Sequence, residues 1–263
     1  MCKRLFSCLL AFLFAFTAPS IMTKAEEAGE QWYIRHTDNH TAPSCDARLT
    51  DLNQYGAYYL GPEGLPNSNE KKLYITFDLG YVNENVIKIM DVLRDKGVHA
   101  AFFILDHVAD KNADILKQLE EDGHLICNHT ANHIDVSKAT KEQFLKEITA
   151  MEQSYTEATG NRLSMFFRPP EGKFSKDSLI WAKEAGYITV FWSFAYSDWD
   201  NQKQPDPAFA KKKILKHTHP REILLLHPTS KTNADILGDL IDIWQEEGYS
   251  FGSLNDLILR TIE

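Results

Sequence analysis

The stretch LYITFDLGYVNENVIKIMDVLRDKGVHAAFFI, residues 73–104, determines the expected fold. It begins and ends with short apolar runs, residues 73–77 and 100–104, of the kind found in buried strands. Between them, apolar residues recur at helical spacing over residues 85–96, and Gly97 follows as a helix stop. A strand, a helix and a second strand in this order predict a unit whose strands lie parallel in one sheet.

The same alternation continues along the chain and predicts the architecture. Further strands are expected at residues 125–127, 165–167, 188–192 and 223–226, and helices at 112–121, 141–159, 176–185, 207–217 and 234–247, with a weak last pair at 250–259. About seven strand–helix units without a reversal predict an α/β fold, a distorted (β/α)7–8 barrel similar to a TIM barrel. Such barrels carry their chemistry on the loops that follow the strands.

Three parts are expected along the chain. Residues 1–25 carry Lys3 and Arg4 before an apolar run and small residues, which is typical of a secretory signal peptide, with an uncleaved anchor as the alternative. Residues 26–70 lack sustained periodicity and are expected to wrap the main domain. Residues 71–263 are expected to form the barrel. The signal predicts export across the cytoplasmic membrane.

Charge and cysteine content exclude several classes of function. The chain has 28 Lys and Arg against 37 Asp and Glu, a formal charge of −9, and loss of the signal would leave −12. This acidity argues against nucleic acid and against an anionic membrane surface as partners. Only Cys45 and Cys127 lie beyond the signal, so no disulfide scaffold is expected, and either one bond or free thiols remain open.

Polar side chains follow most of the expected strands. Because the carboxyl ends of parallel strands meet at one edge of a sheet, these side chains are expected to converge on one mouth. The residues are Asp78, His129, His133, Arg168, Asp198, Trp199 and His227.

The two histidines are candidate metal ligands. His129 and His133 are four residues apart, so on one helical turn both imidazoles would face the same way, which suits a divalent metal such as zinc. A pair of surface or structural histidines is the alternative. Asp78 closes an apolar strand and could act as general base on a water, or else serve as a turn or helix-capping residue.

The remaining candidates form a second charged pair and an apolar wall. Asp198 could orient His227 and raise its basicity, which would place His227 to protonate a leaving group. Arg168, held extended by the following prolines, could pair with Asp78 or be a surface charge. The aromatic side chains could form a wall for a sugar face or pack in the core. They are Trp199, Trp192 and Tyr81, of which Trp192 is expected in the core and Trp199 at the mouth.

The motifs TFDxG (76–80), HTxxH (129–133), RPPxG (168–172), DW (198–199) and LxH (225–227) together resemble those of the polysaccharide deacetylases of carbohydrate esterase family 4. The resemblance covers about residues 71–255. The family removes N-acetyl or O-acetyl groups from glycans with a metal-bound water. The resemblance implies a catalytic base at Asp78, metal ligands at His129 and His133, Arg168 as the residue that orients Asp78, and Asp198 as support for the acid His227.

One branch of the family looks closer still, the δ-lactam-forming peptidoglycan deacetylases of spore formers. The lead-in 32–43, the stretch 58–61 and the insert 198–204 resemble that branch. The resemblance implies N-acetylmuramic acid in peptide-stripped peptidoglycan as substrate, muramic δ-lactam of the spore cortex as the outcome, and a location in the cell wall or cortex space. The lactyl carboxylate of the sugar is expected to meet one local cation, either Arg168 or the metal.

Further expectations follow from this resemblance. Tyr81, Trp199 and Pro169 are expected to bind substrate. The partner would be a glycan strand, and the protein a monomer without an integral membrane domain beyond the signal. Two alternatives remain, a deacetylase of N-acetylglucosamine polymers such as chitooligosaccharides, and a catalytically silent glycan-binding homologue.

One position departs from the common family pattern. TFDDG has a second Asp, the third metal ligand, where this chain has Leu79, although the δ-lactam branch often lacks that Asp as well. Zinc is therefore expected as the divalent metal without its identity being settled. Either Asp78 both binds the metal and acts as base, or the metal is weakly held.

Overall fold

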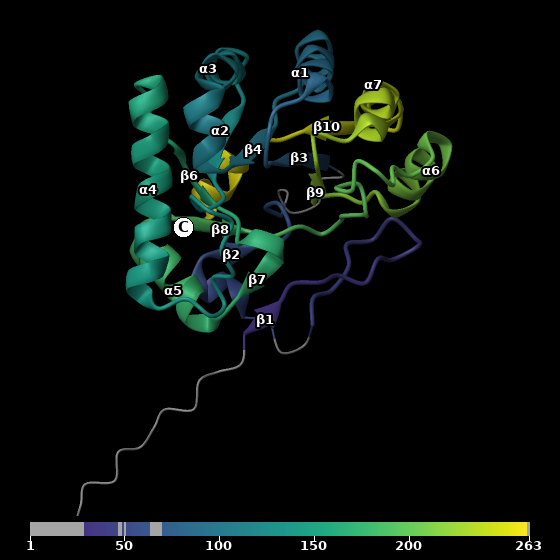
Figure 1. Ribbon diagram of the computed structural model, residues 1–263. Helices are drawn as coiled ribbons and strands as arrows, with labels where there is room; N and C mark the ends of the chain where they lie inside the picture. The colour runs from purple at the N-terminus through teal and green to yellow at the C-terminus, as the bar shows by residue number, and fades with distance from the viewer. Residues whose placement is uncertain (1–28, 47–48, 50, 64–69, 262–263) are drawn as a thin grey trace, which may run out of the picture.

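The computed structural model describes residues 29–46, 49, 51–63 and 70–261. An eight-stranded parallel sheet curls into an incomplete barrel, with neighbours in the order β10-β3-β4-β5-β6-β8-β2 and with β9 also paired to β3 (Figure 1). The predicted α/β barrel is confirmed. The strands are β2 (Ala57–Tyr58), β3 (Lys71–Leu79), β4 (Ala101–Ile104), β5 (Leu125–Asn128), β6 (Ser164–Phe167), β8 (Ile188–Val190), β9 (Glu222–Leu226) and β10 (Tyr249–Phe251).

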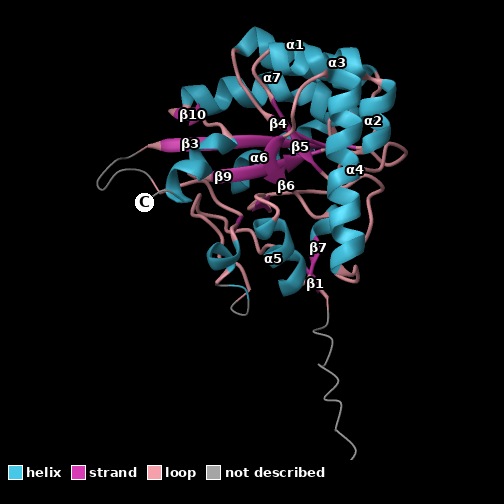
Figure 2. Ribbon diagram, turned by 90° about the vertical axis from the view of Figure 1, so that its left-hand side faces the viewer, coloured by secondary structure: helices cyan, strands magenta, loops and turns pink. Residues whose placement is uncertain are grey.

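Helices cover the outer side of the curled sheet, as Figures 1 and 2 show. The main apolar cluster lies between the two layers and includes Phe77 of the sheet with Ile89 and Trp244 of the helices. Burial of this interface is the main source of stability. The helices are α1 (Glu84–Lys96), α2 (Asp106–Lys111), α3 (Ala113–Glu121), α4 (Lys141–Thr159), α5 (Lys176–Glu184), α6 (Pro207–His217) and α7 (Lys231–Glu246).

Capping residues fix the ends of the best-predicted helices. The side chain of Asn83 accepts hydrogen bonds at the start of α1, and Gly97 ends it in the left-handed conformation with φ 62°. Thr140 and Gln143 form a capping box at the start of α4. These signals are local, so the sequence predicts both helices to within one residue.

Short elements differ from the sequence expectation. The expected helix 112–121 is α3 alone, and a separate helix α2 begins directly after β4. Asn112 between them has φ −136° and ψ 34°, which is not helical. The stretch before residue 71 supplies β2, which pairs with β8, and β1 (Glu30–Gln31), which pairs antiparallel with β7 (Lys173–Phe174). Two-residue strands are too short to give a hydrophobic period.

Trp32 anchors the first of these short strands on the barrel. Its side chain is buried, its indole N–H donates to the carbonyl of Trp192 at 2.9 Å, and its ring stacks on Phe191 with 4.8 Å between centroids. The expected signal, residues 1–25, lies outside the described residues. Within the described part of the chain, no helix has the length and apolarity needed to span a bilayer. Cys45 and Cys127 are both free thiols, and Cys127 is buried.

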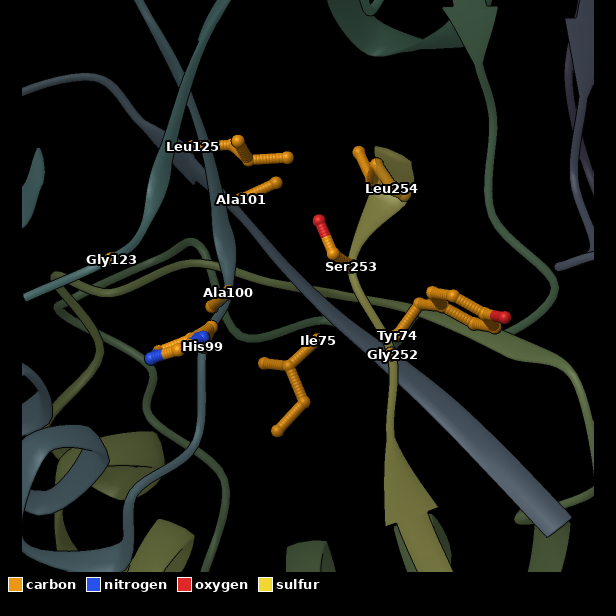
Figure 3. Close-up of a pocket in the computed structure, with 10 residues that line it drawn as sticks. All are labelled: Tyr74, Ile75, His99, Ala100, Ala101, Gly123, Leu125, Gly252, Ser253 and Leu254. Atoms are coloured by element: carbon orange, nitrogen blue, oxygen red, sulfur yellow. The ribbon is translucent and has the colours of Figure 1, made fainter. Parts of the chain in front are cut away.

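One cavity lies among the first residues of the central strands, at the amino end of the sheet. Figure 3 shows the small cavity there, bordered by Tyr74 and Ile75 of β3, Ala101 of β4, Leu125 of β5 and Ser253. Its volume is about 10 Å³, which is room for one water at most. A ligand the size of a sugar does not fit this cavity.

Candidate active site

A cavity of about 680 Å³ opens at the carboxyl end of the strands. This size lies in the range of ~300–1,000 Å³ found for small-molecule sites. The residues that border it lie in strands β1, β3 and β9 and in the loops after β3, β4, β5, β6, β8 and β9. They are Gln31, Asp78, Gly80, Leu105, His129, His133, Glu171, Trp192, Ala195, Tyr196, Trp199, Leu225 and His227.

Asp78, which borders this cavity, forms an ion pair with the buried side chain of Arg168. Arg168 is fully buried, and its Nη1 donates to Asp78 Oδ1 at 2.7 Å, its Nη2 to Thr76 Oγ1 at 2.8 Å and its Nε to the Val190 carbonyl at 3.0 Å. Burial opposes ionisation of Asp78, but the charge and the hydrogen bond of Arg168 outweigh it and hold the pKa of the carboxyl below its usual value. Asp78 is therefore a carboxylate able to accept a proton.

The expectation that Arg168 meets a substrate carboxylate is wrong. All three guanidinium nitrogens have protein partners, and the side chain is inaccessible to solvent. The guanidinium also lies over the ring of Phe103, 4.1 Å from its centroid. Arg168 is not among the described residues that border the cavity, and its bond to Asp78 is its link to a residue that does.

His129 is oriented with one free nitrogen. Its Nδ1 lies 2.8 Å from the carbonyl of Arg168, which can only accept, so Nδ1 carries the proton and Nε2 the lone pair. Nε2 is 3.6 Å from Asp78 Oδ2. Burial lowers the pKa of His129 to about 4 against the opposing effect of Asp78. A neutral imidazole with a fixed tautomer is the form in which histidine binds metals.

His133 comes beside His129, but the two are not on a helical turn as expected. Their ring centroids are 5.1 Å apart, and the connecting loop contains left-handed residues, Thr130 with φ 68° and His133 itself with φ 55°. Asn128 holds this loop, because its side-chain oxygen accepts from the Thr130 N–H at 2.9 Å and its amide donates to the Ile148 carbonyl at 3.1 Å. Proximity of the rings thus comes from a braced loop rather than helical periodicity.

His227 and Asp198 form the second charged pair. Asp198 is buried, its Oδ1 lies 2.8 Å from His227 Nδ1, and its Oδ2 accepts from the His227 backbone N–H at 2.8 Å. Burial alone would lower the pKa of His227, but Asp198 outweighs it and raises that pKa above the usual value. Nε2 is left as the free ring nitrogen on a histidine that borders the cavity.

Asn233 supports this pair and was not predicted from the sequence. Its amide donates to Asp198 Oδ2 at 2.6 Å and to the His227 carbonyl at 3.0 Å, and its oxygen accepts from the hydroxyl of Tyr196. Gln204 adds a bond to the Asp198 carbonyl at 2.9 Å. Asn233 lies in the first turn of α7, where a polar residue is ordinary, so no sequence signal separates it from a helix-start residue.

The aromatic residues divide differently from the expectation. Trp199 is 65% exposed and borders the cavity, as expected at the mouth. Trp192, expected in the core, is half-buried and also borders it. Tyr81 is 48% exposed and contacts Asn201, whereas Pro169 is buried. Neither is among the described residues that border the cavity.

The donors for a metal are few. In the described part of the chain, no three His, Cys, Asp or Glu side chains form a group able to hold a metal ion. Leu79, at the position of the second Asp in TFDDG, is fully buried in the apolar cluster between sheet and helices. Side chains alternate along a strand, so Leu79 points away from the side of Asp78. The imidazoles of His129 and His133 are the neighbouring pair of expected ligands that the structure offers, so a metal bound here would have few protein ligands.

Comparison with known proteins places these features in a family. Residues 66–190 match the family model described as polysaccharide deacetylase. The chain is 36% identical over 230 residues to the peptidoglycan-N-acetylmuramic acid deacetylase PdaA of Bacillus subtilis (strain 168), covering 87% of this chain and 86% of PdaA. It is also 36% identical to an uncharacterized 30.6 kDa protein of Geobacillus stearothermophilus, covering 87% of this chain and 85% of that protein.

Solved structures agree with this match. The structure of Bacillus subtilis PdaA, described as a family 4 carbohydrate esterase, superimposes with a TM-score of 0.82 at 35% identity and covers 89% of this chain and 98% of that chain. A family 4 carbohydrate esterase from Bacillus anthracis gives a TM-score of 0.70 at 35% identity, covering 88% of this chain and 96% of that chain.

Proposed function

Because the chain belongs to the polysaccharide deacetylases of carbohydrate esterase family 4, we propose that it removes the N-acetyl group from N-acetylmuramic acid in peptide-stripped peptidoglycan. One observation carries the proposal: a carboxylate paired with Arg168 and an imidazole paired with Asp198 border the same cavity. The choice of muramic acid rests on the 36% identity to PdaA of Bacillus subtilis.

Asp78 is the proposed general base. It takes a proton from the water that attacks the acetamide carbonyl carbon, and its depressed pKa keeps it ionised for this task. Arg168 is the positioning residue, since its bond to Oδ1 fixes the carboxylate and leaves Oδ2 toward His129. A fixed carboxylate avoids reorganisation during the attack.

His227 is the proposed general acid. It donates a proton to the nitrogen of the sugar as the C–N bond of the acetamide breaks, so the products are acetate and a free amine. Asp198 stabilises the protonated imidazole and holds Nδ1, which directs the transferable proton to Nε2. The raised pKa of His227 suits a group that must carry a proton near neutral pH.

His129 and His133 would hold the divalent metal on which this family generally depends. When bound, such a metal supplies a Lewis acid that polarises the carbonyl oxygen and lowers the pKa of water. The chain's own contribution is the neutral, oriented imidazole of His129, fixed by the Arg168 carbonyl. Imidazole nitrogens are common zinc ligands, and zinc is the metal proposed here.

The product chemistry extends the proposal beyond hydrolysis. The free amine of the deacetylated sugar closes on the lactyl carboxyl of the same residue, which gives muramic δ-lactam and releases water. We place this reaction outside the cytoplasmic membrane, on glycan strands of the cell wall or spore cortex, and with a monomeric enzyme.

Acetate release from matched substrates tests the proposal. Purified protein should release acetate from peptide-stripped glycan that contains N-acetylmuramic acid, and much less from chitooligosaccharides. Treatment with a chelator should abolish release, and added Zn²⁺ should restore it. Preferential action on chitooligosaccharides would favour the glucosamine alternative, and glycan binding without acetate release at any added metal would favour a silent homologue.

A further inference from the structure

We propose that Gln31 and Glu171 form a glycan subsite in which they hydrogen-bond sugar hydroxyl groups, and so determine how tightly the strand is held. The inference rests on the proposed function, because it assigns another wall of the same cavity. Both side chains are exposed and border that cavity together with Asp78 and His227. Neither belongs to the acid, base or metal-ligand set.

The first strand brings Gln31 to the cavity. β1 pairs with β7 so that Gln31 lies opposite Lys173, and the next residue, Trp32, donates its backbone N–H to the Gly172 carbonyl at 2.7 Å. Successive side chains of a strand point to opposite sides, so burial of Trp32 turns Gln31 outward to the cavity. The anchoring contacts of Trp32 thus position Gln31.

Backbone conformation brings Glu171 to the same wall. Glu171 has φ 54° and ψ 12°, a left-handed conformation that is uncommon for a residue with a side chain. The following Gly172 has φ 66°, and a Cβ there would lie 2.7 Å from the ring of Trp192 and 3.0 Å from Trp32. The loop is therefore packed tightly against the anchored strand. Strained residues of this kind gather at functional sites.

The charges at this wall indicate which ligand group it takes. Lys173 Nζ is bound to Glu171 Oε2 at 2.6 Å and is not among the described residues that border the cavity, so the wall presents a carboxylate and a carboxamide. A carboxylate that is already paired with Lys173 offers no free cation to the lactyl carboxylate of muramic acid, but its oxygens accept hydrogen bonds from hydroxyls. Trp199, 65% exposed in the same cavity, adds an aromatic surface of the kind that sugar rings pack on. The wall therefore fits the neutral, hydroxyl-bearing part of the glycan.

Steady-state kinetics of acetate release test this subsite. Gln31→Ala removes the carboxamide, and Glu171→Gly removes the carboxylate while favouring the left-handed backbone. Each change should raise KM about three- to tenfold and leave kcat within about twofold, because the lost hydrogen bonds act equally in ground and transition states. Tyr33→Phe is the matched control on the same segment, since its hydroxyl contacts Asp46 and not the cavity, and it should behave as wild type.

The outcomes separate the subsite from the proposed function. Unchanged KM in both variants, or a fall in kcat at unchanged KM, would overturn the subsite while leaving the deacetylase intact. If wild type releases no acetate, the proposed function fails, and calorimetric binding of the same peptide-stripped oligosaccharides then decides. Tighter binding by wild type than by either variant supports the subsite, and equal or absent binding overturns it.

Discussion

At the scale of a single residue, Asp78 depends on Arg168 to stay ionised, so the loss of Arg168 should lower the stability of the fold. Arg168 is fully buried and supplies the 2.7 Å bond to Asp78. Arg168→Met would leave a buried carboxylate without its partner, so we expect the free energy of unfolding to fall by about 3–5 kcal/mol. Denaturant titration measures the change. Adding Asp78→Asn to that variant should recover part of the loss, and a variant as stable as wild type would contradict the pairing.

Glu222 gives a pH dependence of stability that is independent of the reaction. It is fully buried, and burial raises its pKa from 4.5 to about 8 despite a hydrogen bond from the backbone N–H of His219. Between these values the unfolded chain loses a proton that the folded chain keeps, so stability attributable to Glu222 falls as pH rises from about 4.5 to 8. Glu222→Gln removes the titrating carboxyl group and, with it, this pH dependence of stability.

Thermal and denaturant unfolding at two pH values checks that expectation. The drop in unfolding free energy between pH 5 and pH 8 should be smaller in Glu222→Gln than in wild type, by on the order of 2–4 kcal/mol. Asp235→Asn, an exposed acidic position on α7, is the control and should keep the wild-type difference. Equal pH dependence in all three proteins would show that Glu222 does not titrate as described.

At the scale of an element, the first turn of helix α7 contacts the pair formed by Asp198 and His227. Asn233 is buried and donates to both Asp198 and the His227 carbonyl. Asn233→Ala removes one donor from a buried carboxylate, so we expect a loss of about 1–3 kcal/mol in stability and a fall in kcat of about tenfold. Acetate release and unfolding curves measure both, with Asp235→Ala on the same helix as control. Unchanged kcat would mean that α7 does not position His227.

The sequence predicts elements well where a signal is local and poorly where it is not. The capping residues Thr140 and Gly97 mark the start of α4 and the end of α1, so these helices can be predicted. The motif residues follow the strands, so the mouth of the barrel can be predicted as well. The loop that carries His129 and His133 cannot be predicted in this way. Its left-handed conformation is held by hydrogen bonds of Asn128 to Thr130 and to Ile148 of α4, and such contacts leave no periodic pattern in the sequence. The sequence also gives no signal for Gln31, because a two-residue strand is too short to show a hydrophobic period.

At the scale of the whole molecule, the candidate site residues gather at the carboxyl end of the sheet. The cavities at the amino end have about 10 Å³ and, beside Lys71 and Tyr249, about 370 Å³, against about 680 Å³ at the carboxyl end. The formal charge of −9 argues against a broad basic surface, and of the two cations expected to meet the lactyl carboxylate, Arg168 or the metal, Arg168 is buried. The molecule therefore suits a nearly neutral glycan held by local contacts rather than a polyanion held by charge.

Mass spectrometry of peptide-stripped cortex glycan, incubated with wild type or with Asp78→Asn, tests the central claim most directly. The account predicts that wild type converts N-acetylmuramic residues to deacetylated and lactam forms with stoichiometric acetate, while Asp78→Asn, which keeps the shape of the side chain but cannot take up a proton, loses at least about 100-fold in rate. Equal conversion by the two proteins, or acetate lost from glucosamine residues alone, would contradict it.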